Sequence, residues 1–270
     1  MSFVVDQEPP PHQPRHAAPD PWGDRIRTGV RGTGQTLITA GLVILLFVAY
    51  ELWVTNIFNA HTQNVLQNRL QDEWSQGRDP LATGPSKPGT RIRDIPLGDG
   101  VALIRIPAFG PDWVFTVVEG TGESELAEGP GHYTDTALPG AVGDFAVAGH
   151  RVGKGSPFLN LDKLNAGDSI VIETKDYWYD YQVLGDKASG DATQVDQDGI
   201  PGLEIVRPTD IDVIDPVPGH PGRTPNRRLI TLTTCHPRFS AAQRLIIHGE
   251  MVGAPLKKAP GVVPPALQNS

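Results

Sequence analysis

Cys235 is the only cysteine in the 270 residues, and it stands where the β-forming run LITLTTC meets a polar loop. A lone thiol excludes an intramolecular disulfide and a cysteine-based zinc site. It can act as a nucleophile, which requires a thiolate and therefore a nearby histidine or another cation. Thr231, Thr233 and Cys235 would share one face of the strand, and this polar face disfavours an inert core thiol.

An arginine is expected beside this cysteine. The runs LITLTTC and RLIIHGEM are typical of two strands, joined by the loop HPRFSAAQ. If these strands pair antiparallel, the end of the first meets the start of the second, and Cys235 and Arg244 become neighbours. Acyl transfer at the thiol needs such a positive group or donor to face the oxyanion.

The histidine partner stays open on spacing alone. His150 ends the run GDFAVAGH and opens onto a loop, and strand ends are where barrel folds place site residues. His236 follows the cysteine directly. We rank His150 first and His236 second, with little to separate them. A hydrogen-bonded loop or surface residue remains the commoner role for any single histidine.

The region that must position these residues begins near residue 91. From there, short β-branched or aromatic runs alternate with Gly, Pro and Asp. Eight such runs predict a mainly β domain, either an antiparallel sandwich or a closed barrel. The run FLNLDKLN is the only helical turn expected among them. Residues 186–228 form a long, loop-rich segment, and loops of this length are usually functional or mobile.

The N-terminal part predicts a membrane anchor. Residues 1–35 are rich in Pro and polar, and we expect a disordered cytoplasmic tail there. Residues 36–58 are mainly apolar and predict one transmembrane helix, in preference to a cleaved signal peptide or a buried core helix. Arg25, Arg27 and Arg31 precede this helix, which favours an N-terminus inside the cell and a β domain outside it.

The remaining segments complete the expected organisation. Residues 59–94 predict a short amphipathic helix and a linker, residues 95–253 the β domain, and residues 254–270 a second disordered tail. The net charge is −8, from 23 basic and 31 acidic side chains, and no Lys/Arg cluster stands out. Nucleic acid is therefore not an expected partner.

These motifs together resemble the sortase family. TLTTC, at residues 231–235, is similar to the family signature TLxTC. AVAGHR, at residues 146–151, and Arg244, nine residues after the cysteine, match the other two catalytic positions. The stretches ALPG, GSPFLNLDKLNAGD and PVPG and the apolar N-terminal segment resemble class E sortases of high-GC Gram-positive bacteria. The resemblance covers about residues 95–253.

The resemblance implies an eight-stranded sortase-type β-barrel with short helices and a cysteine transpeptidase activity. Such an enzyme would cut secreted proteins at a C-terminal LAXTG or LPXTG sorting signal, between Thr and Gly. Cys235 would form a thioacyl intermediate, His150 would act as acid and base, and Arg244 would hold the substrate and stabilise the oxyanion. The acceptor would be an amine of a peptidoglycan precursor or cross-bridge. We expect no metal and no other cofactor.

Two further residues are candidates for substrate binding. Tyr133 lies in a loop that the family layout places near the histidine, and a tyrosine that merely closes a turn is an equal alternative. Thr234 could offer its hydroxyl to a substrate or simply satisfy the strand. The segment PTDIDVIDPVPG, at residues 208–219, matches the loop that walls the signal groove in sortases.

Two other functional classes compete with this interpretation. An L,D-transpeptidase-like enzyme would also use a cysteine for acyl transfer, but its expected local signature, of the type HxxxxxxSHGC, is absent from the sequence. A non-enzymatic surface domain that binds peptides or wall polymers is the alternative of a different kind. It would not require Cys235, His150 and Arg244 together.

Overall fold

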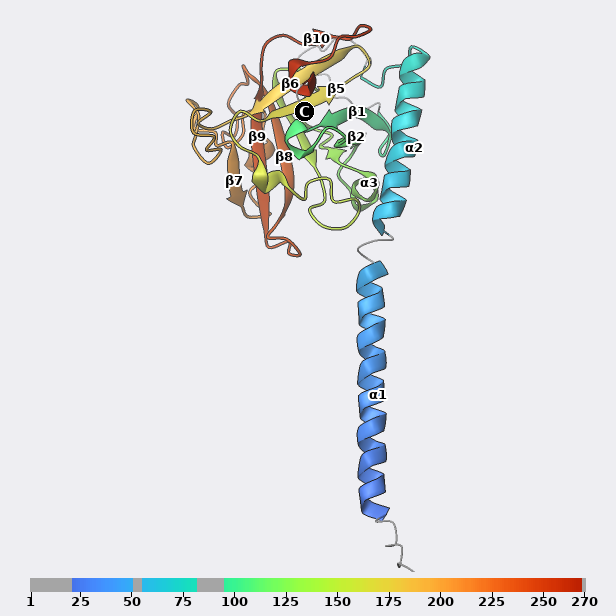
Figure 1. Cartoon of the computed structure of the whole chain (residues 1–270). Coiled ribbons are helices and arrows are strands. Elements are labelled where there is room, and N and C mark those ends of the chain that lie inside the picture. The colour runs from blue at the N-terminus through green and yellow to red at the C-terminus, as the bar shows by residue number, and fades with distance from the viewer. Residues whose placement is uncertain (1–20, 51–54, 82–94, 269–270) are drawn as a thin grey trace, which may run out of the picture. The chain divides into compact units, whose positions relative to one another are not determined.

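The computed structural model of this chain, shown in Figure 1, describes residues 21–50, 55–81 and 95–268. The chain divides into two compact units, residues 1–50 and residues 51–270. The helix α1 (Pro21–Ala49) belongs to the first unit, and every other helix and strand belongs to the second.

Helix α1 contains the candidate membrane span. Its stretch Gly29–Val48 has 20 residues and a mean hydropathy of 1.4, enough in length and composition to cross a bilayer. This stretch overlaps the expected span of residues 36–58, of which residues 51–54 lie outside the described residues. Residues 1–20 of the expected tail lie outside the described residues.

The second unit is built on ten strands. Their bounds are β1 (Gly100–Arg105), β2 (Val114–Glu119), β3 (Gly131–His132), β4 (Gly143–Ala148), β5 (Ser169–Glu173), β6 (Tyr177–Val183), β7 (Leu203–Val206), β8 (Arg228–His236), β9 (Gln243–Met251) and β10 (Leu256–Lys257). The long helix of this unit is α2 (Thr55–Ser75), and its short helices are α3 (Glu123–Glu128), α4 (Pro265–Gln268), η2 (Pro107–Phe109), η3 (Leu161–Lys163) and η4 (Ile211–Ile214). The helical turn expected in FLNLDKLN is confirmed as η3.

Eight of these strands close into a barrel, as predicted. The ring runs β6–β5–β1–β2–β3–β4–β8–β9, and the pairing of β9 with β6 closes it. The pairs β2–β3 and β4–β8 are parallel, and the other pairs of the ring are antiparallel. Strands β10 and β7 pair outside the ring, with β6 and β9 respectively.

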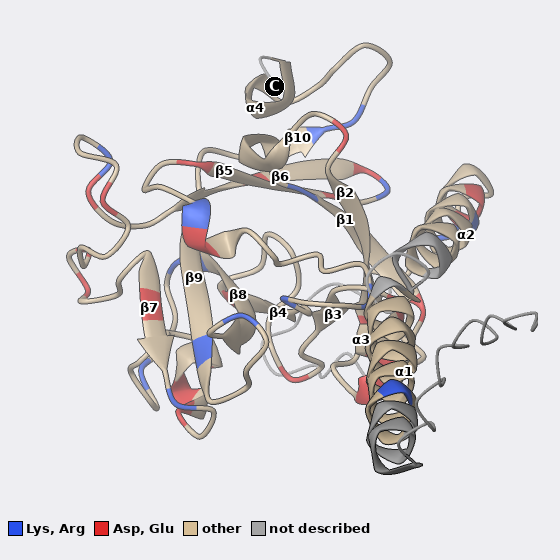
Figure 2. Cartoon of the chain, turned by 60° about the horizontal axis from the view of Figure 1, so that its bottom comes forward, with Lys and Arg blue, Asp and Glu red and all other residues tan. Residues whose placement is uncertain are grey.

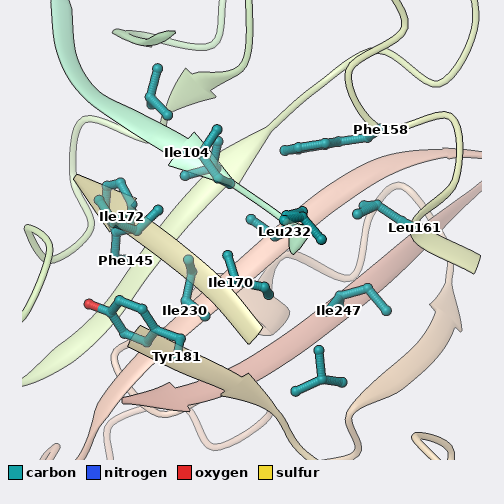
Figure 3. Close-up of a cluster of buried hydrophobic side chains, with 14 of the residues drawn as sticks. Ile104, Phe145, Phe158, Leu161, Ile170, Ile172, Tyr181, Ile230, Leu232 and Ile247 are labelled. Carbon is teal, nitrogen blue, oxygen red and sulfur yellow. The ribbon is translucent and has the colours of Figure 1, made fainter. Parts of the chain in front are cut away.

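Alternating apolar positions fill the barrel (Figure 3). On β8 the core residues are Ile230 and Leu232, and on β9 they are Leu245 and Ile247. This spacing of two is the pattern by which successive side chains of a strand point to opposite faces. Each of these side chains is at most 1% exposed, and burying one contributes roughly 1.5–3 kcal/mol. The barrel core therefore holds both β8 and β9 in their register.

Helix α2 packs against β1 and β2 of the barrel, as Figure 1 shows. Leu66 and Leu70 are its buried residues. The side-chain amide of Gln63 adds directed contacts, since Oε1 accepts the Thr116 N–H at 2.7 Å and Nε2 donates to the Glu128 carbonyl at 2.7 Å. The helix lies where an amphipathic helix was expected, and residues 82–94 of the expected linker lie outside the described residues.

The structure describes the C-terminal segment through residue 268, where we expected a disordered tail. Lys258 attaches the start of this segment to the barrel unit. Its Nζ lies 2.6 Å from Glu173 Oε1 of β5 and stands over the rings of Trp74, at 4.7 Å, and Trp178, at 5.2 Å. One ammonium group thereby joins the C-terminal segment, α2 and β6. Polar and Pro-rich composition alone did not indicate this contact.

Replacing Lys258 with methionine will lower the free energy of unfolding by about 1–2 kcal/mol, because the ion pair and both cation–π contacts are lost. Urea unfolding followed by tryptophan fluorescence measures the change. Lys257→Met is the matched control, since Lys257 is the exposed neighbour in β10. Equal effects of the two substitutions would contradict the contact's role.

The long segment 186–228 contains secondary structure, namely β7 and η4. It shares a second apolar cluster with residues that flank it, formed by Leu184, Ile200, Val217 and Leu229. Arg227 binds Asp196 at 2.6 Å and Glu250 at 2.7 Å. In Figure 2, basic and acidic residues are interspersed over this part and over the rest of the barrel unit.

Candidate active site

The β8–β9 hairpin places the lone cysteine opposite the arginine. In the antiparallel register, Cys235 pairs with Arg244, which confirms that they are neighbours. The alternation along β8 turns Ile230 and Leu232 into the core, so Cys235 shares the other face with Thr233. The thiol is half-buried.

A parallel strand pair brings His150 to the same level as the cysteine. Strand β4 runs alongside β8, and the last pair of their ladder is Ala148 with Thr233. The Gly149 N–H continues the ladder by donating to the Thr233 carbonyl at 3.0 Å. Two residues beyond that last pair, the two strands reach His150 and Cys235.

Gly149 fits this position because it has no side chain. A Cβ atom there would lie 2.5 Å from the ring of Phe158, which is buried in the core. Only glycine therefore permits the chain to pass this ring and then present His150. The carbonyl of Gly149 accepts a hydrogen bond of 2.8 Å from the Thr234 hydroxyl, which ties the same point to β8.

His150 and Cys235 line one pocket. Its volume is about 260 Å³, and its lining residues are His150, Arg151, Val152, Cys235, Phe239, Ser240 and Ala241. His236 is not among them, since it follows the cysteine on the strand and points to the opposite face. The pocket thus brings together the thiol and the histidine that spacing ranked first.

The surroundings of His150 favour its neutral form. Burial is the largest effect and lowers the pKa of the half-buried imidazole below its ordinary value. The positive charge of Lys154 lowers this pKa further, and Glu123 opposes it. A histidine with a lowered pKa is neutral at pH 7 and can accept the proton of a thiol.

His236 is held in a different way. Its Nδ1 lies 2.7 Å from Nη1 of Arg151. A guanidinium can only donate hydrogen bonds, so Nδ1 accepts and the proton of the neutral ring is on Nε2. The lone pair that a base would use at Nδ1 is therefore occupied.

A model of the Sortase domain family matches residues 104–252, from within β1 to just past β9. The chain belongs to the sortase family. It is 36% identical to Sortase SrtE1 of Streptomyces coelicolor over 230 residues, which are 82% of this chain and 57% of that relative. The chain thus spans little more than half of that relative's length.

Solved sortase structures share the barrel. The SrtF sortase from Corynebacterium diphtheriae aligns with a TM-score of 0.59 and 35% identity, covering 70% of this chain and 99% of that one. Sortase E1 from Streptomyces coelicolor, solved with a tripeptide in the active site, aligns with a TM-score of 0.52 and 35% identity, covering 63% and 97%. Recognition as a class E sortase is confirmed. Sortases are cysteine transpeptidases, and membership of the family supports an enzyme.

Arg244 of this sortase is occupied by its own chain. Its Nη1 donates to the carbonyls of Ala241, at 3.1 Å, and Gln243, at 3.0 Å, in and next to the β8–β9 loop. The guanidinium lies beside the cysteine through the strand register but is not among the groups that line the pocket. Both of these hydrogen bonds use Nη1, so the Nε and Nη2 donors are the groups that a substrate would meet.

Tyr133 reaches β8 two residues before the cysteine. Its hydroxyl forms a hydrogen bond of 3.0 Å with Thr233 Oγ1. The preceding residue, His132, is fully buried and fixes the loop, with Nδ1 2.8 Å from Glu119 Oε2 and Nε2 3.1 Å from Thr136 Oγ1. Tyr133 is therefore held rigidly on the face that carries Cys235.

The structure places Thr234 inside the fold. The residue is 3% exposed, and its hydroxyl already donates to Gly149, so it joins β8 to the segment of His150. Thr233, its neighbour, lies on the face of the cysteine. Sequence analysis did not single out Arg151 or Phe239, which also line the pocket. Arg151 was visible in AVAGHR, but no spacing rule gave it a role.

Proposed function

We propose that this sortase is a membrane-anchored cysteine transpeptidase that cleaves a C-terminal LAXTG or LPXTG sorting signal between Thr and Gly. It then joins the Thr to an amine of the cell wall. The observation that carries the proposal is the pocket shared by Cys235 and His150 in a sortase barrel, with Arg244 opposite the cysteine.

Acylation begins with proton transfer from the Cys235 thiol to neutral His150. The thiolate attacks the Thr carbonyl carbon, and a C–S bond forms. Arg244 donates to the oxyanion through Nε or Nη2, since only Nη1 bonds the loop carbonyls, and the oxyanion accumulates charge as the tetrahedral species forms. The C–N bond then breaks, and His150 gives its proton to the departing Gly amine.

Transfer to the acceptor reverses these roles. The acceptor amine attacks the thioacyl carbon, His150 takes its proton, and the Cys235 thiolate leaves. Tyr133 bonds Thr233, which lies on the same face of β8 as Cys235 and two residues before it, and Tyr133 is the proposed contact for the substrate backbone. Thr234 contributes indirectly, since its hydroxyl is held by Gly149.

The proposed substrates are secreted proteins with the sorting signal, and the proposed acceptor is a peptidoglycan precursor or cross-bridge amine. The tripeptide in the Streptomyces Sortase E1 active site supports a peptide substrate. The span in α1 supports single-pass anchoring. The arginines before it favour an N-terminus in the cytoplasm and a barrel outside.

Quenched LAXTG and LPXTG peptides test the proposal. The full chain in detergent micelles is incubated with each peptide and an amine, and mass spectrometry follows the products. We expect cleavage between Thr and Gly and an amide between the Thr and the added amine. Failure to cleave both peptides, with an unreactive thiol, would contradict the proposal.

The pH dependence of kcat/KM will reflect the electrostatics of His150. In the active enzyme, Cys235 and His150 together hold one proton. A second proton on the His150 imidazole removes the base, so activity falls as the pH drops through the pKa of His150. Since burial and Lys154 lower the pKa, the acidic limb lies below the ordinary value for histidine. Lys154→Gln removes a positive neighbour, raises the pKa and moves the limb to higher pH. Lys187→Gln makes the same charge change at an exposed residue that does not line the pocket, and it should leave the acidic limb in place.

A further inference from the structure

Arg151 is a nearly buried cation in the pocket of the proposed nucleophile and base. Its side chain is 3% exposed, and it follows His150 directly. A buried charge destabilises the fold unless other groups pair with it and accept its hydrogen bonds. Nη2 lies 3.0 Å from Asp162 Oδ2, and Nη1 lies 2.7 Å from His236 Nδ1. A longer contact of 3.5 Å runs from Nη1 to the Cys235 carbonyl.

These contacts join three separate parts of the barrel unit. Arg151 belongs to the segment after β4, His236 and the Cys235 carbonyl belong to the end of β8, and Asp162 belongs to η3. The β4–β8 ladder ends at Ala148 and Thr233, before it reaches the two reactive side chains. Beyond that point, the guanidinium is a further link between the chain that carries His150 and the chain that carries Cys235.

The hydrogen bond from Arg151 also determines the tautomer of His236. Because Arg151 donates to Nδ1, the neutral imidazole keeps its proton on Nε2. His236 thus serves as an acceptor that fixes Arg151, while His150 lines the pocket together with Cys235.

We propose that Arg151 is a positioning residue that holds His150 and Cys235 at reactive distance, with His236 as its acceptor and Asp162 as its counter-ion. The role rests on the proposed transpeptidation. It differs from a general stabilising role, since a displacement of about 1 Å in such a pair can lower the rate roughly a hundredfold without weakening substrate binding.

Arg151→Met tests the proposal in the full chain in detergent micelles. We expect kcat for LAXTG peptide cleavage to fall by roughly 10- to 100-fold with KM nearly unchanged. Arg238→Met is the matched control, because Arg238 is 41% exposed and approaches the same Asp162 only to 3.6 Å. Its kcat should stay within about twofold of wild type, as for an exposed side chain with one weak ion pair and one hydrogen bond, of 3.3 Å to the Leu159 carbonyl. A wild-type kcat for Arg151→Met would overturn the proposal.

Three further variants keep the test decisive if Arg151→Met folds poorly. Asp162→Asn removes the counter-ion from a half-exposed site and should lower kcat with KM unchanged. His236→Asn keeps an acceptor near the place of Nδ1 and should retain more activity than His236→Leu. Arg151→Met in the His236→Leu background should add little further loss, because the two residues share one interaction. Fully additive losses would show independent roles and overturn the proposal.

The histidine tautomer gives a readout without turnover. In NMR spectra of ¹⁵N-histidine-labelled protein, His236 should carry its proton on Nε2 in the wild type, and its Nδ1 signal should shift in Arg151→Met. A wild-type enzyme that cleaves no sorting peptide would refute the proposed function and leave the tautomer result standing. A wild type that cleaves, with variants equal to it, would refute only the role of Arg151.

Discussion

Replacing Cys235 with alanine will lower kcat/KM for sorting-signal peptides by roughly a thousandfold or more, with the barrel intact. The thiol is the one cysteine of the chain and lines the pocket beside His150, so its removal leaves no group there that can form the thioacyl bond. The residue is half-buried and the substitution removes a single atom. The fold should therefore lose little stability.

Two measurements check this expectation. Peptide turnover is followed for both proteins, and iodoacetamide labelling should add one adduct to the wild type and none to the variant. Ser240→Ala is the matched control, since Ser240 also lines the pocket and its hydroxyl is the alternative nucleophile to the thiol. This hydroxyl accepts a hydrogen bond from the Ala242 N–H. Persistent turnover in Cys235→Ala, or its loss only in Ser240→Ala, would show that another residue is the nucleophile.

Replacing His150 with alanine will lower kcat/KM by roughly 10²–10⁴-fold, the range typical of a general acid–base group. Its imidazole lines the pocket of the thiol, and its lowered pKa keeps it neutral and able to take a proton. His236→Asn should retain most activity. Its Nδ1 is already bound to Arg151, and Asn supplies an acceptor in its place.

The same peptide assay, run from acidic to basic pH, distinguishes the two histidines. His150→Ala should also lose the acidic limb, because the group that titrates there is gone. Thermal unfolding of both variants shows whether a loss comes from folding. If only His236→Asn abolishes turnover, the base is His236, and the pocket has been assigned to the wrong histidine.

Sequence reasoning succeeded where the pairing is local. The neighbouring positions of Cys235 and Arg244 follow from one hairpin, whose alternation and loop length are visible in the chain. The choice between His150 and His236 depends instead on the parallel pairing of β4 with β8, which lie far apart in sequence. No local pattern contains that register. The family resemblance, and not the spacing, supplied the choice of His150 as the base.

Side-chain contacts across the fold were the other limit. Lys258 of the C-terminal segment contacts Glu173 and two tryptophans, but its neighbourhood in sequence is polar and rich in Pro. Arg151 stands next to the proposed base, yet its partners come from η3 and β8. Such contacts form only after the barrel has brought distant segments together, so composition and periodicity do not predict them.

The long segment between β6 and β8 takes no part in the parallel pairing of β4 with β8, so it could be exchanged between relatives without changing that pairing. The register that aligns His150 with Cys235 comes from the barrel strands on either side, while residues 186–226 leave and return between β6 and β8. Ile200, Val217 and Asp196 lie in this segment, whereas their partners Leu184, Leu229 and Arg227 belong to the flanking chain. A chimera that exchanges this segment therefore has to keep β7, because Val206 of β7 pairs with Arg244 of β9, which in turn lies opposite Cys235.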